Sequence, residues 1–537
     1  MTPQEALSYE RAGDLHFSPD GTRLVFTVNS YRWDWRPRLR IVDVASGNVR
    51  EVTPTGKSER APQYSPDGKT LAFLSNRDGK TQIYAMSSDG GQPRALTAHK
   101  FGVDSFHWSR DGREIAFLAK DDDAASEGSG PQVADRESDL SRLWLVNPAT
   151  RAARRLGVNG YRIDEFQWLD ASDILIAATG KPRVEESTDA IYSVSTKDGA
   201  VRTIGHPPQP FDSLLVSPDG KRFAVRSTRT MGPMARDLFL GTIGGNDLSD
   251  VSDPPGLAVA EARWHEDNAI WLRVVDGLVN RLWRIAPGAR SVAVELPLSV
   301  AAFDISRSGL LAFVGEDFGH LPALYLRDAA GHLRLLAKLG GEGIRLAPAT
   351  IFRTKSFDGT EIESALMKPA GVQGKLPLVV LVHGGPSSNF SAGYGWETAW
   401  AQLLASHGYE VLMVNPRGSN GYSEDFLKAN RGDWGGGDYR DIMTVLDMVI
   451  AKGDTDASRL GIGGWSYGGE MTAWAIGHTN RFKAAVDGAG VFDQQAEFET
   501  EDDPSGDEWY FGDPWEHADV FARNSPASFI RNVRTPT

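Results

Sequence analysis

The chain has 537 residues, of which 41% are hydrophobic and 24% charged, and its net charge is −14. This length exceeds that of one ordinary domain, and the composition is that of a soluble globular protein. The acidic charge disfavours nucleic-acid binding, and the lack of cysteine excludes disulfides, thiolate catalysis and Cys-ligated zinc. No apolar run is long enough for a membrane span or a signal-peptide core. We therefore expect a cytoplasmic protein with no membrane partner, and a periplasmic or secreted one only where a signal peptide has been removed.

Residues 13–345 carry an internal repeat, preceded by an N-terminal segment, residues 1–12, that we expect to pack on the C-terminal domain. Each unit has an apolar strand, a tight turn of the Ser-Pro-Asp-Gly type, a second apolar strand and a third. The seven turns lie at Ser18, Ser65, Ser109, Asp170, Ser217, Asp267 and Ser306. A period of roughly 40–50 residues predicts a seven-bladed β-propeller, in which these turns are structural. The acidic insertion Asp121–Arg136 is expected to be a surface loop, with a gate or an oligomer contact as the alternative.

Residues 346–537 change to strands that alternate with helices, which predicts a parallel α/β sheet. A hairpin is expected over Phe352–Leu366 and helices over Trp396–His407, Tyr439–Ala451 and Tyr467–Gly477. Strands are expected over Leu376–Val382, Glu410–Val414 and Leu460–Gly464, with a further one from Lys483. Together these elements predict an α/β-hydrolase domain.

The motif Gly464-Trp465-Ser466-Tyr467-Gly468 lies between a predicted strand and a predicted helix. It is the nucleophile elbow of α/β-hydrolases, in which a strained turn presents the serine and glycines avoid clashes. Ser466 is therefore the expected nucleophile, and the Tyr467 backbone N–H is one expected oxyanion donor. The second is expected from Gly385, within His383-Gly384-Gly385-Pro386 at the end of an upstream strand.

A propeller followed by His383–Pro386, Asn415–Ser419, Asp433–Gly436 and the Ser466 motif resembles the prolyl oligopeptidase family of serine peptidases. Within that family the chain most resembles the acylaminoacyl-peptidase branch. The resemblance implies hydrolysis of short peptides, no metal and no organic cofactor, and assembly into dimers or larger homo-oligomers. Glu470 stands where many relatives carry an aromatic residue. We expect a helix-surface or salt-bridged carboxylate there, with a pocket role as the alternative.

The partners of Ser466 are not evident, because in this fold the acid and the histidine follow the serine in the chain. Only His478 and His517 follow Ser466, and neither is in a suitable segment. The resemblance implies an Asp and a His beyond the strand that Ile530–Thr537 approaches. We therefore expect a hydrolase domain that is incomplete at its C-terminus and a lone chain that is inactive. Three explanations stay open: a separate C-terminal chain completes the domain, the sequence is part of a longer one, or the protein is a natural pseudoenzyme.

The expected function is a serine peptidase that releases N-terminal acyl-amino acids or short N-terminal fragments through an acyl-enzyme on Ser466. The alternatives are a dipeptidyl-peptidase-like exopeptidase, an esterase-like acyl hydrolase, and a propeller interaction protein with an inactive hydrolase domain. The Glu185-Glu186 pair resembles the pair with which dipeptidyl-peptidase IV relatives hold a free amine, although paired glutamates on a turn are ordinarily just solvated. Arg417 is a further candidate for substrate binding.

Overall fold

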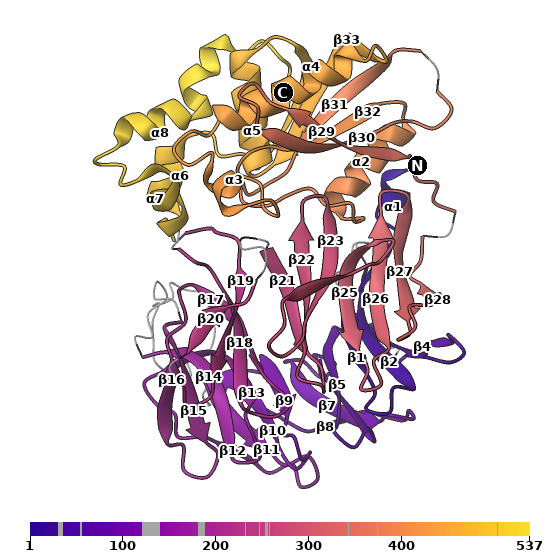
Figure 1. The fold of residues 1–537 in the computed structure, drawn as a ribbon, viewed down its shortest axis with the longest axis vertical. Coiled ribbons are helices and arrows are strands. Elements are labelled where there is room, and N and C mark those ends of the chain that lie inside the picture. Colours follow the sequence, from indigo (N-terminus) through magenta and orange to yellow (C-terminus); the bar gives the residue numbers. More distant parts are fainter. Residues whose placement is uncertain are drawn as a thin grey trace.

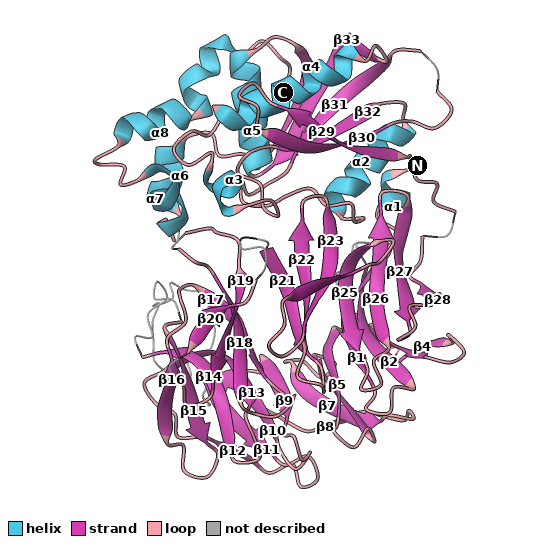
Figure 2. Ribbon diagram, viewed as in Figure 1, coloured by secondary structure: helices cyan, strands magenta, loops and turns pink. Residues whose placement is uncertain are grey.

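The computed structural model describes residues 1–30, 36–53, 56–120, 140–180, 188–230, 232–245, 247–252, 256, 258–341, 343–372, 374–501 and 503–537. These residues form a propeller and, above it in the view of Figure 1, an α/β domain. The helices gather in the α/β domain, as Figure 2 shows. The predicted insertion Asp121–Arg136 and the Glu185-Glu186 pair lie outside the described residues.

Seven four-stranded antiparallel sheets make up the described part of the propeller, so the predicted architecture is confirmed. The first four blades contain β1 (Glu10–Phe17), β2 (Arg23–Ser30), β3 (Arg38–Asp43), β4 (Val49–Glu51); β5 (Glu59–Tyr64), β6 (Thr70–Ser75), β7 (Gln82–Ser87), β8 (Arg94–Ala95); β9 (Ser105–Trp108), β10 (Ile115–Lys120), β11 (Ser141–Val146), β12 (Ala153–Arg155); β13 (Arg162–Trp168), β14 (Asp173–Thr179), β15 (Ala190–Ser195) and β16 (Val201–Gly205). The last three contain β17 (Phe211–Val216), β18 (Arg222–Ser227), β19 (Asp237–Thr242), β20 (Leu248–Asp250); β21 (Ala258–Trp264), β22 (Ile270–Asp276), β23 (Val279–Ile285), β24 (Ser291–Val294); β25 (Ser299–Ile305), β26 (Leu311–Asp317), β27 (His320–Arg327) and β28 (Leu333–Lys338).

The repeated turns hold the first two strands of a blade together. At Ser18, Ser65, Ser109 and Ser217, the serine hydroxyl donates to the aspartate two residues later and accepts the backbone N–H five residues later. The second strands are buried on both faces because neighbouring sheets stack on them. The ring closes without a shared strand, through apolar packing of the first blade against the seventh.

The α/β domain is built on a sheet with the order β29-β30-β32-β31-β33-β34. The four strands from β32 to β34 are parallel, and β29 and β30 are antiparallel. The strands are β29 (Ala349–Lys355), β30 (Glu361–Met367), β31 (Leu376–Val382), β32 (Glu410–Asn415), β33 (Thr455–Trp465) and β34 (Phe482–Gly488). Each predicted strand is present, and each predicted helix ends within two residues of its expected bounds.

Helices cover the two faces of this sheet unequally. One face packs on α4 and α5, and the opposite face packs on α2 over β30, β31 and β32. The helices are α1 (Pro3–Ala6), α2 (Trp396–Ser406), α3 (Glu424–Lys428), α4 (Gly437–Ala451), α5 (Tyr467–His478), α6 (Gln494–Thr500), α7 (Ser505–Phe511) and α8 (Ala518–Asn524), with the 3-10 helix η2 (Pro526–Asn532). Within the described ranges, no helix combines the length and the apolar character that crossing a bilayer requires.

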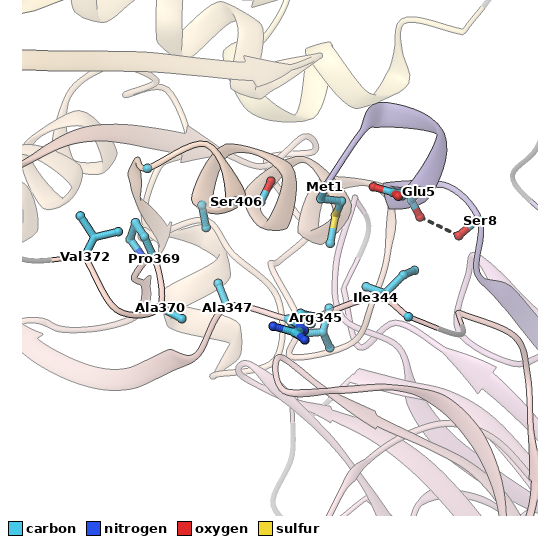
Figure 3. A pocket seen from close by; sticks show the side chains of 14 residues that line it. Met1, Glu5, Ser8, Ile344, Arg345, Ala347, Pro369, Ala370, Val372 and Ser406 are labelled. Atoms are coloured by element: carbon cyan, nitrogen blue, oxygen red, sulfur yellow. Dashed lines mark hydrogen bonds between the residues drawn. The ribbon is translucent and has the colours of Figure 1, made fainter.

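The propeller meets the α/β domain at several places, among them the β22–β23 hairpin and the N-terminus. The hairpin of β22 and β23 reaches that domain (Figure 1), where the Gly277 N–H donates to the Gly421 carbonyl and Asn389 donates to the Gly277 carbonyl. At the N-terminus, α1 packs against α2, and the Tyr9 and Tyr394 rings meet edge to face. A cavity of about 450 Å³ lies beside α1 and the linker between the domains (Figure 3), and no residue of the Ser466 motif lines it.

Candidate active site

Ser466 occupies the turn between β33 and α5, and its backbone lies in the left-handed region at φ 56° and ψ −125°. Few non-glycine residues adopt this conformation, so the turn stores backbone strain. Hydrogen bonds hold it from both sides: the Ser466 N–H donates to the Gly488 carbonyl at 2.8 Å, and the Ser466 carbonyl accepts the Glu470 N–H at 3.0 Å. The serine itself is exposed. The geometry is that of the predicted elbow.

The glycines of the motif allow α5 to approach β31 closely. A Cβ atom on Gly468 would lie 2.1 Å from the Val382 carbonyl oxygen, and one on Gly464 would lie 2.5 Å from the same atom. Trp465, between Gly464 and Ser466, is 47% exposed and meets Trp396 at the start of α2. The elbow is thus fixed against the end of β31, from which the His383–Pro386 loop begins.

The His383–Pro386 loop lies directly against Ser466. A Cβ atom built on Gly384 would lie 3.5 Å from the Ser466 Cβ, and Gly385 has a φ of 125° that favours glycine. The buried His383 ring anchors this loop, with Nε2 2.9 Å from the Ser419 hydroxyl and Nδ1 2.7 Å from the Gly384 carbonyl. Burial lowers the pKa of His383 to about 4, so the ring is neutral.

Glu397, on the first turn of α2, adds a carboxyl group to this loop. Burial raises its pKa to about 7, and the Gly384 backbone N–H, which donates to it, opposes that rise. The structure therefore surrounds Ser466 with backbone groups of the two predicted oxyanion segments and one partly buried acid. Sequence reasoning missed Glu397 and the His383–Ser419 contact, because each depends on segments that are separate along the chain.

The Tyr467 side chain fixes the position of its backbone. Its ring is buried and meets Trp434 edge to face, and its hydroxyl donates to Asp438 Oδ2 at 2.6 Å. Burial raises the pKa of Asp438 to about 7, against the lowering effect of the Tyr467 hydroxyl. Burial and the neighbouring Asp438 also raise the pKa of Tyr467 well above its ordinary value. No local pattern in the sequence pointed to this pair.

The Asp438 carboxyl makes stability depend on pH. Its folded-state pKa of about 7 lies above the ordinary value, so the native state binds the proton more tightly than the unfolded chain does. As the pH rises from roughly 4 to 7, the contribution of this group to the free energy of unfolding therefore falls by about 1.4 kcal/mol per pH unit. We expect Asp438→Asn to flatten this part of the profile, measured by urea unfolding from pH 4.5 to 7.5. Parallel profiles of the two proteins would contradict the assignment.

Arg417, the predicted substrate-binding candidate, is engaged by carboxylates in the structure. Its guanidinium meets both oxygens of the buried Asp441 at 2.8 Å and Asp358 Oδ2 at 2.9 Å. These contacts use the Nε and Nη2 donors of the guanidinium, and the pairing with Asp441 is bidentate. These contacts connect the loop after β32 to α4 and to the β29–β30 turn, and they favour a structural role.

No histidine of the described residues bonds to the Ser466 hydroxyl. His478 ends α5, stacks on Trp474 with ring centroids 4.3 Å apart, and contacts the Trp474 carbonyl. His517 is the exposed residue before α8. The Asp493 carboxylate accepts the first N–H groups of α6. The structure therefore does not bring an acid–histidine pair to Ser466.

Glu470 does not fit the expected helix-surface or salt-bridged carboxylate, and that expectation is wrong. Its side chain is 3% exposed and accepts a hydrogen bond from Gln494 Nε2 at 2.6 Å, without an ion pair in the described part of the chain. Burial raises its pKa well above the ordinary value. The reason is that α5 is buried all round between the sheet and the segments after β34, so no face of the helix at this level meets water.

Comparison with known protein families matches two separate parts of the chain. Residues 396–537 match the model of the prolyl oligopeptidase family, and residues 11–143 match that of the TolB beta propeller domain. The chain is 29% identical to the uncharacterized peptidase YuxL of Bacillus subtilis, over 90% of this chain and 81% of the relative. It is 25% identical to dipeptidyl-peptidase 5 of Porphyromonas gingivalis, over 100% of this chain and 86% of the relative.

Solved structures share the arrangement of both domains. Pyrococcus horikoshii acylaminoacyl peptidase superposes with a TM-score of 0.82 at 22% identity, over 99% of this chain and 86% of that one. At this identity the likeness concerns the fold.

Proposed function

We propose that this chain, whose residues 396–537 form a domain of the prolyl oligopeptidase family, is a serine peptidase that cleaves short peptides at Ser466. The observation that carries the proposal is the exposed Ser466 on its strained elbow, with the Gly384-Gly385 backbone against it. Ser466 Oγ attacks the substrate carbonyl carbon, and the Tyr467 and Gly385 N–H groups stabilise the oxyanion. The C–N bond then breaks, the amine leaves, and water hydrolyses the acyl-enzyme.

The serine also needs a base, and the contacts of His383 and His478 hold both rings away from it. His383 is neutral and anchors a loop, and His478 is stacked on Trp474. We infer that these 537 residues alone do not hydrolyse peptides and that a further polypeptide segment supplies the histidine and its acid. A separate C-terminal chain is one form of that segment.

An apolar groove supports this inference. It measures about 650 Å³ and lies on the α2 side of the sheet, lined by Trp400, Leu403, Tyr409 and Val486 among others. Val486 on β34, the edge strand of the sheet, is 68% exposed, which is high for a large apolar side chain. The Ala485 N–H donates to the Pro536 carbonyl, so the last residues already run beside β34. A segment that pairs there and covers the groove would approach Ser466 from the carboxyl ends of the strands.

For the products, we propose N-terminal acyl-amino acids or short N-terminal fragments. A second candidate, release of free dipeptides, is favoured by the relative named dipeptidyl-peptidase 5, which aligns with all of this chain.

The two candidates differ in the charge of the substrate's first residue. We expect the complete protein to cleave an acetyl-alanyl reporter with a kcat/KM at least tenfold above that for an alanyl-alanyl reporter with a free amine, measured at pH 7.5. Burying the charged amine of the alanyl-alanyl reporter costs free energy unless a carboxylate pairs with it. The preference for the acetylated reporter therefore reverses only if the protein supplies such a carboxylate. Exclusive cleavage of the free dipeptide would replace the first candidate by the second.

A further inference from the structure

Two neighbouring blades carry the same acid–arginine pair at the propeller axis. In the fifth blade Asp212 of β17 lies opposite Arg226 of β18, and in the sixth Glu261 of β21 lies opposite Arg273 of β22. The atoms meet at 2.8 Å (Arg226 Nε to Asp212 Oδ1) and 3.4 Å (Arg273 Nε to Glu261 Oε2). The first strands of adjacent blades, such as β13, β17 and β21, contact one another, so these acids lie around the axis.

Each of the two carboxylates is shared by a second arginine. Arg236 Nε lies 3.2 Å from Asp212 Oδ2, and Arg263 Nε lies 2.9 Å from Glu261 Oε1. Arg226 also donates from Nη1 to the Val259 and Ala260 carbonyls, which join the two clusters. Four guanidinium groups thus meet on two carboxylates, although Arg263 contacts Asp304 as well. These arginines lie close together within a chain of net charge −14.

Arg273 is the member with unused donors. In the part of the chain that the structure describes, only its Nε has a partner, and its side chain is 19% exposed. A guanidinium carries five N–H donors, and no residue that the structure describes accepts a hydrogen bond from the two NH₂ groups of Arg273. Burial lowers the pKa of Arg273, and repulsion from Arg226 and Arg11 adds to this effect. An anion between these groups relieves both costs.

The cluster lies on the strand that leads to the candidate active site. Gly277, four residues after Arg273, donates to Gly421, and that loop contacts His383 through Ser419. Four residues of strand span about 13 Å. Arg273 is therefore about this far along the chain from a propeller residue that contacts the α/β domain.

We propose that Arg273, with Arg226 beside it, binds a carboxylate of the peptide substrate inside the propeller. The carboxylate is either the free C-terminus of the peptide or an acidic side chain. The inference rests on the proposed peptidase function for its ligand, but it concerns a site that is separate from Ser466. Such a site gives a negatively charged peptide a local cationic partner within an acidic chain.

The test measures binding without turnover, in the complete protein with Ser466→Ala. Three pentapeptides are titrated by calorimetry: penta-alanine with a free C-terminus, the same peptide amidated, and an amidated peptide with one internal glutamate. We expect the free acid or the glutamate peptide to bind about tenfold tighter than the amidated penta-alanine, and the tighter peptide identifies the source of the carboxylate. Arg273→Gln should remove the difference, and Arg273→Lys should keep part of it because the fork geometry is lost.

The matched control is Arg284→Gln on β23, whose side chain pairs with the exposed Asp267 and should leave the difference unchanged. Equal binding of all three peptides, or a tenfold difference that persists in a folded Arg273→Gln protein, would overturn the proposal. If Arg273→Gln fails to fold, Arg273→Lys decides the question. Full retention of the difference in peptide affinity by the lysine variant would contradict recognition of the carboxylate by the guanidinium. If the peptidase proposal fails, the protein will neither hydrolyse peptides nor be labelled at Ser466. The binding test does not depend on either result.

Discussion

Replacing Ser466 with alanine is expected to abolish peptide hydrolysis by the complete protein. Ser466 is the exposed residue of the elbow, and the acyl-enzyme requires its oxygen. Loss of a serine nucleophile lowers kcat by about 10⁴–10⁶-fold, with the remainder supplied by the oxyanion donors and binding. The measurements are kcat/KM on a short peptide reporter and covalent labelling by a fluorophosphonate probe.

Ser458→Ala is the matched control for this prediction. Ser458 lies on the same strand, β33, and its exposed hydroxyl donates to Asp456, away from the elbow. The control should keep full activity and labelling. Hydrolysis by Ser466→Ala above about 1% of wild type would assign the nucleophile elsewhere. A complete wild-type protein that no probe labels at any pH would favour the propeller interaction protein over the peptidase.

The sequence was sufficient for the architecture because its signals are local. The turns at Ser18 or Ser65 close through bonds within six residues, so the same short pattern both predicts and builds the blade. The elbow is similar, because glycine is required at 464 and 468 by contacts within one strand–turn–helix unit and with β31. In both cases the pattern and the contact occupy the same stretch of chain.

Local patterns did not predict the cluster in which Arg226, Arg236, Arg263 and Arg273 meet Asp212 and Glu261. Bulges shift the register between Asp212 and Leu215 and between Val259 and Glu261, so strict alternation along β17 or β21 does not predict which residue faces the axis. Glu470 is a second case, because its burial depends on segments after β34 that cover α5. The Tyr467–Asp438 bond likewise joins two helices across the domain. Each contact depends on tertiary packing that no local period encodes.

Gly468→Ala is expected to be the most damaging substitution outside the nucleophile itself. The new Cβ would lie 2.1 Å from the Val382 carbonyl oxygen, 2.8 Å from its carbon and 2.9 Å from the His383 carbonyl oxygen. All three atoms belong to backbone, so no side-chain rotation relieves the clash. Either α5 or the end of β31 has to move. Such overpacking costs about 1–3 kcal/mol or more of unfolding free energy, measured by urea denaturation.

The loss of activity should exceed the loss of stability, because the same movement separates the two oxyanion segments. Gly384 and Gly385 follow Val382 after one intervening residue, and a displacement of about 1 Å at reacting groups costs roughly 100-fold in rate. Gly506→Ala in α7 is the control, since its Cβ meets nothing within 4 Å and alanine favours the helix. A stable, fully active Gly468→Ala protein would mean that the close approach of α5 to β31 is not what aligns Ser466 with its oxyanion donors.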